Sequence, residues 1–391
     1  MSRAGSQQRT LLGILGLLRP HWRADAALPA RIDAVLGADR RLGSRDRRLY
    51  RELVYTVLRY LPWIEPLLDT DPSEAARRAA WLAADSPAVS PFRESVAAGL
   101  PDCPAGADEK ARILGADADA LSPGWFRDEC PGAFAPPLRE VLLSRAPLWL
   151  RLQADDPGPV LAEFEALDWK WRRSEGVPGA LALPPGSDVA KTRAYVSGKV
   201  EIQDAGSQQV LLSAGVEPGG HWLDACAGAG GKTLQLAALL GAGGRVTARD
   251  PRRSALKELS ARAARAGLAD RIRIGDRADP AGGFDAVLVD APCSGTGTWR
   301  RAPHLKWVTS AAGVRAAARV QLSLLRENAA RVRRGGLLVY STCSLCRSEN
   351  ASVVEAFGSG GSSFEAALSG MTLLPQSHDG DGFFVASFRR T

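Results

Sequence analysis

The sequence predicts an α/β protein whose C-terminal half forms a doubly wound parallel sheet, preceded by a small α+β module and an N-terminal all-helical domain. From about residue 201 onward, apolar runs typical of buried strands alternate with segments of helical length. A glycine-rich turn follows the first of these strands, and two later strands end in turns that contain a cysteine. Because open α/β folds bind ligands at the carboxyl ends of their strands, we expect these turns to form the functional site.

Residues 1–145 are expected to form the helical domain. Leucines between residues 11 and 18 share one helical face, and apolar residues between 49 and 61 share another. The proline- and alanine-rich segments 85–106 and 131–137 are expected to connect short helices.

Positive charge is concentrated near the N-terminus. Residues 1–60 hold twelve arginines and five acidic residues, an excess equal to the +7 of the whole chain. Half of these arginines lie between Arg40 and Arg51, and a second basic stretch covers residues 299–334. Such clusters neutralise phosphates and indicate nucleic-acid binding. A solvated helix face in an arginine-rich chain explains the charge equally well, so charge alone leaves both interpretations open.

Composition bounds the class of protein. With 391 residues, 45% of them hydrophobic and 24% charged, the chain is expected to be globular. No apolar run approaches the roughly 20 residues that span a bilayer, so no membrane partner is expected. The apolar run at residues 11–18 is followed by Arg19-Pro-His-Trp-Arg23 where a signal peptide would have its cleavage site. Six cysteines make no disulfide framework, which favours a reducing, cytoplasmic location.

Two further regions complete the organisation. Residues 146–200 are expected to form the α+β module, with strands at 148–152 and 180–183 and a helix at 160–167. Residues 201–391 carry the sheet, with helices near 231–241, 252–267, 311–332 and 348–357, a Gly/Ser loop at 357–363 and a late strand at 382–388. The expected parallel strands are Trp222-Leu-Asp-Ala225, Arg245-Val-Thr-Ala248, Arg271-Ile-Arg-Ile274, Ala286-Val-Leu-Val289 and Leu337-Leu-Val-Tyr340.

The glycine-rich turn, Trp222 to Thr233, lets backbone N–H groups approach a ligand at a helix N-terminus. It fits neither common nucleotide motif. A P-loop requires glycine where Cys226 stands, and a dinucleotide fingerprint requires glycine where Thr233 stands.

Acidic residues end successive strands. Asp250 follows the second strand, where a carboxylate binds ribose hydroxyls; Asp276 follows the third, placed for an adenine amino group; and Asp290 ends the fourth. Each acid taken alone is more often a turn or helix cap. Together with Asp224 they favour a cofactor with adenosine but no phosphates, S-adenosylmethionine. The residues expected to contact it are Cys226, Ala227, Gly228, Ala229, Gly230, Gly231, Lys232, Asp250, Asp276 and Asp290.

Two cysteines follow buried strands, Cys293 in the segment 290–297 and Cys343 in the segment 340–344. A free cysteine is usually a small buried hydrophobe. Two thiols at neighbouring strand ends beside Asp290 favour nucleophilic chemistry instead. Cys343 and Cys346 also form a Cys-x-x-Cys pair, but the chain has no second pair, so no metal site is expected and Cys346 is expected to pack against a helix.

These motifs resemble the Sun-type (nucleolar-protein/Sun) RNA cytosine-5 methyltransferases from about Pro147 to the C-terminus. The matching segments are Gln203-Asp204, Ser207-Gln208, Cys226 to Thr233, Asp290 to Gly297, Thr342-Cys343-Ser344 and Asp381-Gly-Phe-Phe384. More faintly, Leu49 to Arg59 resembles the NusB-like RNA-binding domain of bacterial ribosomal RNA members.

The resemblance implies a Rossmann-like class I methyltransferase sheet and methylation of cytosine C5 in RNA, most readily ribosomal RNA, by a monomer. It makes residues 1–145 a NusB-like RNA-binding domain, 146–200 an RRM-like module and 201–391 the catalytic domain. By resemblance Cys343 is the nucleophile that adds to C6 and Cys293 assists its release. Asp290, if protonated or hydrogen-bonded at N3, offsets the charge that builds there. Lys232 lowers a thiol pKa, fixes the loop, or is purely structural.

Two departures and three alternatives remain open. Gly228-Ala229 stands where the family has a small residue followed by proline, which predicts a more flexible loop, and His304 stands at a usually acidic position, which predicts altered substrate contacts. The alternatives are the same chemistry on transfer RNA, an RNA-binding ribosome assembly factor with secondary catalysis, and a small-molecule methyltransferase. The last would need neither the basic helices nor two thiols.

Overall fold

The computed structural model describes residues 3–275, 283–360 and 363–391. The chain divides into two compact units. The helical unit consists of Met1–Arg145 together with Trp299–Ser310, and the sheet unit consists of Ala146–Thr298 together with Ala311–Thr391. The assignment of three functional domains stays a prediction.

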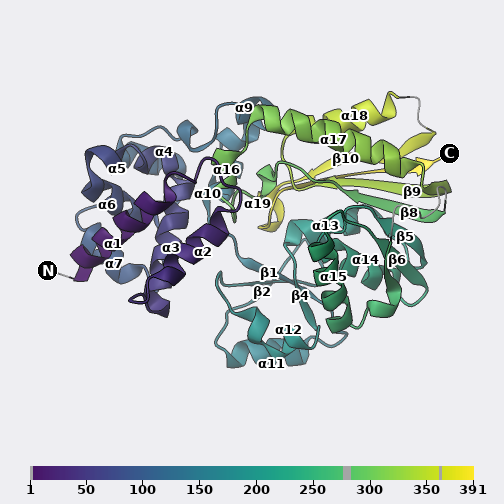
Figure 1. The fold of residues 1–391 in the computed structure, drawn as a ribbon, viewed down its shortest axis with the longest axis horizontal. Helices are drawn as coiled ribbons and strands as arrows, with labels where there is room; N and C mark the ends of the chain where they lie inside the picture. The colour runs from purple at the N-terminus through teal and green to yellow at the C-terminus, as the bar shows by residue number, and fades with distance from the viewer. Residues whose placement is uncertain (1–2, 276–282, 361–362) are drawn as a thin grey trace. The chain divides into compact units, whose positions relative to one another are not determined.

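The helical unit is built from short helices around one apolar core (Figure 1). Its principal helix, α3, buries Leu49, Leu53 and Val57 at helical spacing, and its charges suit the helix dipole, with Asp46 in the first turn and Arg59 in the last. The elements are α1 (Arg3–Leu18), α2 (Leu28–Ala38), α3 (Ser44–Arg59), α4 (Leu61–Ile64), α5 (Leu67–Thr70), α6 (Pro72–Leu82), α7 (Ser90–Val96), α8 (Ala107–Leu114), η1 (Asp119–Leu121), α9 (Phe126–Glu129), η2 (Pro131–Phe134), α10 (Leu138–Leu143) and α16 (Leu305–Val308).

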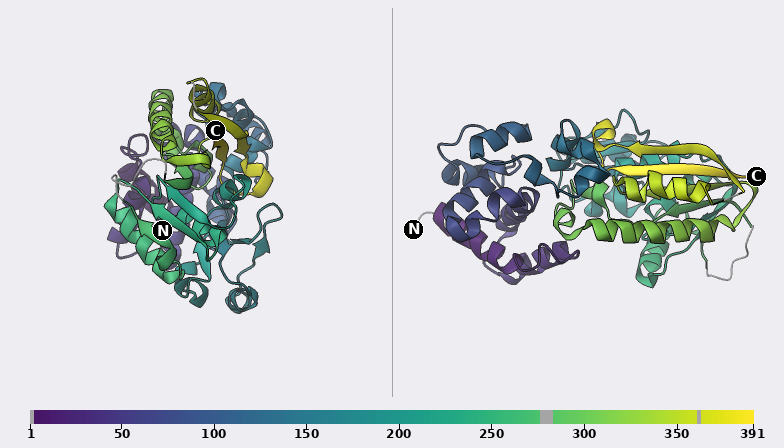
Figure 2. Two further views of the ribbon diagram at one scale, coloured as in Figure 1. Left: turned by 90° about the vertical axis from the view of Figure 1, so that its right-hand side faces the viewer. Right: turned by 90° about the horizontal axis from the view of Figure 1, so that it is seen from above.

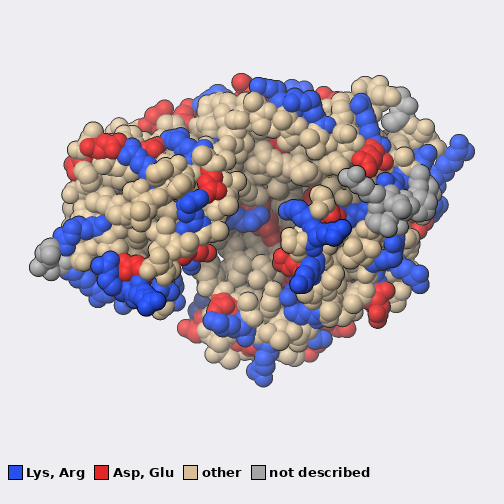
Figure 3. Space-filling view, in the orientation of Figure 1, with Lys and Arg blue, Asp and Glu red and all other residues tan. Residues whose placement is uncertain are grey.

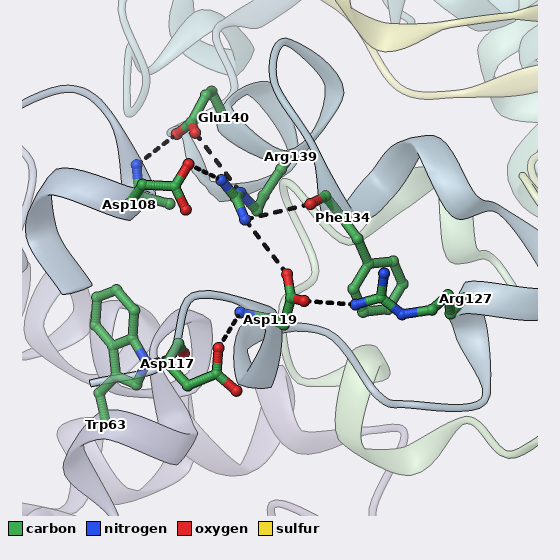
Figure 4. A network of polar contacts seen from close by, with 9 residues as sticks. Trp63, Asp108, Asp117, Asp119, Arg127, Phe134, Arg139 and Glu140 are labelled. Carbon is green, nitrogen blue, oxygen red and sulfur yellow. Dashed lines mark hydrogen bonds and ion pairs between the residues drawn. The ribbon is translucent and has the colours of Figure 1, made fainter. Parts of the chain in front are cut away.

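Buried Arg139 ties the irregular second half of this unit together (Figure 4). Its guanidinium donates to Asp108 and to the carbonyl of Phe134 (3.3 Å), and its Nη1 lies 3.5 Å from Asp119. Asp119 also accepts from Arg127 at 2.6 Å. One guanidinium therefore links three segments, at Asp108, Asp119 and Phe134.

The segment that follows the Cys293 turn belongs to the helical unit. Trp299 is 1% exposed and packs against Phe126, with ring centroids 4.5 Å apart. Lys306 is buried and donates to the carbonyls of Leu121 (2.8 Å) and Arg59 (3.1 Å). Because burial disfavours the ammonium, the pKa of Lys306 falls to about 7.

The sheet unit begins with a small antiparallel sheet of strand order β2-β3-β1-β4. Its apolar face packs on α11, with Leu150, Leu181 and Phe164 buried together. The predicted strands and helix are present; β2 and β4 were not predicted. The elements are β1 (Leu148–Leu152), α11 (Gly158–Ala166), β2 (Arg172–Arg173), β3 (Ala180–Leu183), η3 (Val189–Lys191), α12 (Arg193–Val196) and β4 (Val200–Ile202).

The main sheet has, in the described residues, seven strands in the order β10-β11-β9-β8-β5-β6-β7. Five of them run parallel, and β11 and β10 add an antiparallel edge. The expected parallel strands and the late strand are confirmed, whereas β10 was not predicted. The strands are β5 (Gly220–Asp224), β6 (Gly244–Ala248), β7 (Ile272–Ile274), β8 (Phe284–Asp290), β9 (Val332–Thr342), β10 (Phe364–Leu373) and β11 (Phe383–Arg390).

Helices cover the two faces of this sheet (Figures 1 and 2). Alternate residues of β8 supply the two cores: Ala286 and Leu288 pack with α13 and α14, and Val287 and Val289 with α17 and α18. The remaining elements are α13 (Ala205–Ser213), α14 (Gly231–Leu240), α15 (Arg253–Arg265), η4 (Ala269–Arg271), η5 (Thr296–Thr298), α17 (Ala311–Ala329), η6 (Arg347–Glu349), α18 (Ala351–Gly358) and α19 (Pro375–His378). No helix of the described residues combines the length and apolar character needed to cross a membrane.

The strand order reverses between β5 and β8. From β5 the chain moves outward to β6 and β7, and it then returns to β8 and β9 on the other side. This topological switch point opens a crevice at the carboxyl ends of the strands. The turns that follow β5, β6, β8 and β9 therefore meet at one edge of the sheet.

Candidate active site

The glycine-rich turn lies between β5 and α14, as predicted. Gly230 has a φ of +92°, and a Cβ there would lie 2.7 Å from Cγ of Leu259, so this position requires glycine. Gly228 has a φ of +55°, and its N–H donates to Asp250 at 2.9 Å. The turn therefore presents backbone rather than side chains to the crevice.

Asp224 ends β5 beneath this turn. Its carboxylate is 1% exposed and accepts from the hydroxyl of Thr233 at 2.7 Å. Burial raises its pKa to about 7, and the hydrogen bond from Thr233 only partly opposes this. Asp224 therefore fixes the start of α14 from below the turn.

Asp250 follows β6 and borders a pocket of about 280 Å³. Ala225, Gly275 and Asn328 also line this pocket, so it lies at the strand ends beside α17. Burial acts to raise the pKa of Asp250, but hydrogen bonds from Arg252 and Gly228 lower it overall. The carboxylate is therefore ionised and faces a space suited to a ligand with hydroxyl donors. The predicted adenine contact, Asp276, lies outside the described residues.

Lys232 turns from the first residues of α14 toward β8. Its Nζ lies 2.9 Å from Asp290 and 4.6 Å from the ring centroid of Phe383. Asp290 also accepts from the hydroxyl of Ser341 at 2.5 Å. The structure therefore brings together an ammonium, a carboxylate and a hydroxyl at the ends of β8 and β9.

The two cysteines meet beside this group. Cys293 Sγ lies 3.3 Å from Cys343 Sγ, although fifty residues separate them in sequence. The hydrogen bond to Cys343, together with burial, raises the pKa of Cys293 well above its usual value. The two sulfurs are within hydrogen-bond distance, and either thiol can be the donor.

Glu349, at the end of η6, holds both cysteine turns and was not predicted as a site residue. Its buried carboxylate accepts from the backbone N–H of Ser294 at 2.8 Å and from the hydroxyl of Ser344 at 2.5 Å. Gln321 of α17 donates to it at 2.9 Å. A Ser-Glu-Asn sequence shortly after Cys343 was the available signal, but two partners of Glu349, Ser294 and Gln321, come from distant segments.

The Gly228-Ala229 departure has a compensating contact. Arg262 of α15 donates to the carbonyl of Ala229 at 2.7 Å, and its other nitrogens bind buried Glu201 of β4 at 2.9 and 3.2 Å. Arg262 therefore anchors the turn at the position where the expected flexibility would arise. Cys226 lies in the same turn, and burial raises the pKa of its thiol.

His304 and Cys346 are both buried. His304 is 2% exposed within the helical unit, and its Nε2 lies 3.2 Å from the carbonyl of Ala26. Burial lowers its pKa. Its packing opposes the expectation that it alters substrate contacts. Cys346 is fully buried, 3.6 Å from the hydroxyl of Thr296. In the described part of the chain, no group of three or more His, Cys, Asp or Glu residues is placed to hold a metal ion.

The fold and the crevice define a class I methyltransferase-type α/β protein. A methyltransferase homolog protein from Pyrococcus horikoshii shares this fold with a TM-score of 0.58 at 22% identity, covering 72% of this chain and 98% of that one. Residues 212–389 match the model of the family described as 16S rRNA methyltransferase RsmB/F.

Two relatives extend this match. The chain is 36% identical over 258 residues to a probable ribosomal RNA small subunit methyltransferase B of Bacillus subtilis (strain 168), covering 60% of this chain and 57% of that protein. It is 32% identical over 301 residues to ribosomal RNA small subunit methyltransferase B of Xylella fastidiosa (strain 9a5c), covering 71% and 70%. The matched segment thus covers 57% of the length of the first relative and 70% of the length of the second.

The chain belongs to the RsmB/F family. This membership confirms the resemblance drawn from the motifs, and the cofactor of the family is S-adenosylmethionine.

Proposed function

We propose that the protein methylates C5 of a cytosine in small-subunit ribosomal RNA through a covalent cysteine adduct. The observation that supports this activity best is the pair of thiols, which lie 3.3 Å apart beside the Lys232–Asp290 ion pair at the switch point of the sheet. The names of the relatives support the ribosomal target. Location in the cytoplasm and a monomeric state stay predictions.

The residues around the crevice fit the cofactor. The turn that requires Gly230 and the pocket beside Asp250 suit an adenosine whose ribose hydroxyls donate to a carboxylate. Backbone groups of residues 226–231, Asp250 and Asp276, which lies outside the described residues, would hold it. S-adenosylmethionine, when bound, supplies an electrophilic methyl group.

The proposed reaction uses the two thiols in sequence. Cytosine C5 is a poor nucleophile, and addition of the Cys343 thiolate to C6 makes C5 enamine-like while negative charge builds toward N3. Lys232, at the start of α14, offsets that charge through its ammonium, and Asp290, at the end of β8, offsets it when it carries a proton and donates it to N3. After C5 is methylated, a base removes its proton, the C5–C6 double bond forms again and Cys343 is expelled as a thiolate. Cys293, adjacent to the Cys343 sulfur, assists this release.

The helical unit is proposed to bind the RNA. Arg40, Arg41, Arg45, Arg48 and Arg51 are exposed where α2 ends and α3 begins. Figure 3 shows Lys and Arg side chains gathered over this end of the unit. Arg41 pairs with Asp39 and Arg51 with Asp33, so part of the charge is locally compensated. The others provide a surface that neutralises phosphates.

The test is methyl transfer from radiolabelled S-adenosylmethionine to purified small-subunit ribosomal RNA and to bulk transfer RNA, followed by bisulfite sequencing. Label at one cytosine of the ribosomal RNA, lost in Cys343→Ala, is the expected result. Label confined to transfer RNA would show that the target is wrong. Label in neither RNA, from a folded protein that binds the cofactor, would reject the activity.

A further inference from the structure

Glu349 lies within hydrogen-bond reach of both cysteine turns. It ends η6, between β9 and α18, and its side chain is 0% exposed. Its Oε1 accepts from the N–H of Ser294, and its Oε2 accepts from the hydroxyls of Ser294 and Ser344. These serines directly follow Cys293 and Cys343 in sequence. A single carboxylate therefore joins the turn after β8 to the turn after β9.

The position of Glu349 is itself fixed from two other elements. Gln321 of α17 donates to its Oε1 at 2.9 Å and to the carbonyl of Pro292 at 3.0 Å. Tyr340 of β9 donates to the main-chain carbonyl of Glu349 at 2.5 Å. Gln321 of α17 thus holds the side chain of Glu349, and Tyr340 of β9 holds its main chain. The carboxylate therefore has little freedom to follow either cysteine turn if that turn moves.

We propose that Glu349 is a positioning residue that sets the separation of the Cys293 and Cys343 sulfurs and so makes Cys343 the more reactive of the two thiols. The geometric part of this inference concerns the free protein; its consequence for turnover rests on the proposed function.

Charge supports the geometric argument. The pKa of Cys293 is raised chiefly by its hydrogen bond to Cys343 and by burial, and the nearby negative charge of Glu349 raises it further. Replacing the carboxylate by an amide removes that charge and leaves fewer acceptors for the two serines. The thiol separation and the difference in reactivity between the two thiols should then both relax.

The test compares Glu349→Gln with two controls by measuring how fast iodoacetamide alkylates each thiol between pH 6 and pH 10, using peptide mass spectrometry. Tyr340→Phe removes the hydroxyl that contacts the main-chain carbonyl of Glu349 and Oε1 of Gln321, but it leaves the carboxylate and the serines intact. Glu355→Gln makes the same chemical change on exposed α18, where Glu355 lies 4.0 Å from Arg347. Ser344→Ala removes one hydrogen bond to the Glu349 carboxylate, and it replaces Glu349→Gln as the test variant if that protein fails to fold.

In the native protein and both controls, Cys343 should react well before Cys293. In Glu349→Gln and Ser344→Ala the ratio of the two rates should fall by about tenfold, the change in thiolate fraction that one pKa unit produces. The rate of methyl transfer should fall while the affinity for S-adenosylmethionine stays unchanged.

An unchanged ratio in Glu349→Gln would overturn the proposal. So would an equal fall in Tyr340→Phe, because it would show that any damage to the network has this effect. Alkylation requires neither RNA nor cofactor, so native protein that is inactive on RNA but shows the expected thiol ratios would reject the proposed function and leave the positioning role standing.

Discussion

Replacing Gly230 by alanine should damage both folding and cofactor binding, because the new methyl group has no space. The φ of +92° costs an L-residue about 1–2 kcal/mol. The added Cβ would also lie 2.7 Å from Cγ and 3.2 Å from Cδ1 of Leu259, a side chain that is 0% exposed. Forcing an extra methyl group into a packed core costs about 1–3 kcal/mol. The two effects together predict a loss of about 2–5 kcal/mol.

The neighbouring glycine provides the matched control. Gly231 begins α14, and a Cβ there would have no heavy atom within 4 Å among its described neighbours. Alanine at a helical glycine stabilises by about 0.5–1 kcal/mol, so Gly231→Ala should be neutral or slightly stabilising.

Thermal denaturation and calorimetric titration with S-adenosylmethionine measure the two consequences. At about 2–4 °C per kcal/mol for a unit of this size, Gly230→Ala should melt roughly 5–15 °C below Gly231→Ala. Its affinity for the cofactor should also fall, since the turn must move to relieve the clash. If the two variants melted together and bound the cofactor equally, the reasoning from the turn geometry would be wrong.

Three further predictions follow from the thiols, the arginines and a buried acid. Cys343→Ala should form neither a covalent RNA adduct nor methylated RNA, whereas Cys293→Ala should accumulate a shifted band on denaturing gels; the opposite assignment of bands would mean that the two roles are exchanged. Replacing Arg45 and Arg48 by alanine should weaken RNA binding and flatten its dependence on salt, with turnover at saturating RNA unchanged, and an unaltered salt slope would leave them as a solvated face. Because the pKa of Asp224 is raised from 3.8 to about 7 in the folded protein, the folded state binds the proton more tightly, and the Asp224 contribution to stability falls as pH rises from about 4 to 7. Asp224→Asn should therefore raise the melting temperature more at pH 8 than at pH 5, and a pH-independent difference would contradict this.

Local patterns were sufficient to predict the parallel strands and the turns that carry the site. A buried strand of β-branched and leucine residues that ends in Asp, Gly or Cys is recognisable without knowledge of its neighbours. The edge strand β10 could not be recognised in this way, because most of its residues from Phe364 to Leu373 are not buried and show no alternation of apolar and polar residues. Its structure depends on pairing with β11, which is a property of the folded sheet.

Contacts between distant segments could not be predicted from the sequence either, because they too depend on the folded structure. Lys306 donates to carbonyls that lie 185 and 247 residues away, so its place in the helical unit could not be found from the basic stretch around it. Glu349 gains its partners from the turns after β8 and β9 and from α17. In each case the residue type was visible, but its surroundings are created by tertiary packing.

The motifs that suggested the family also contact one another, which explains why they occur as a set. Gly297, which closes the Cys293 turn, donates to the carbonyl of Cys343 at 3.0 Å and accepts from the N–H of Gly382 at 2.8 Å. A Cβ on Gly297 would lie 2.0 Å from the carbonyl oxygen of Gly382, so three backbones pack without side chains at this point. Asp204 of the lead-in motif accepts from the N–H of Asp381 at 2.9 Å, which anchors the closing segment. The lead-in and closing motifs therefore carry none of the proposed chemistry themselves; they fix the backbone on which the Cys293 and Cys343 turns meet.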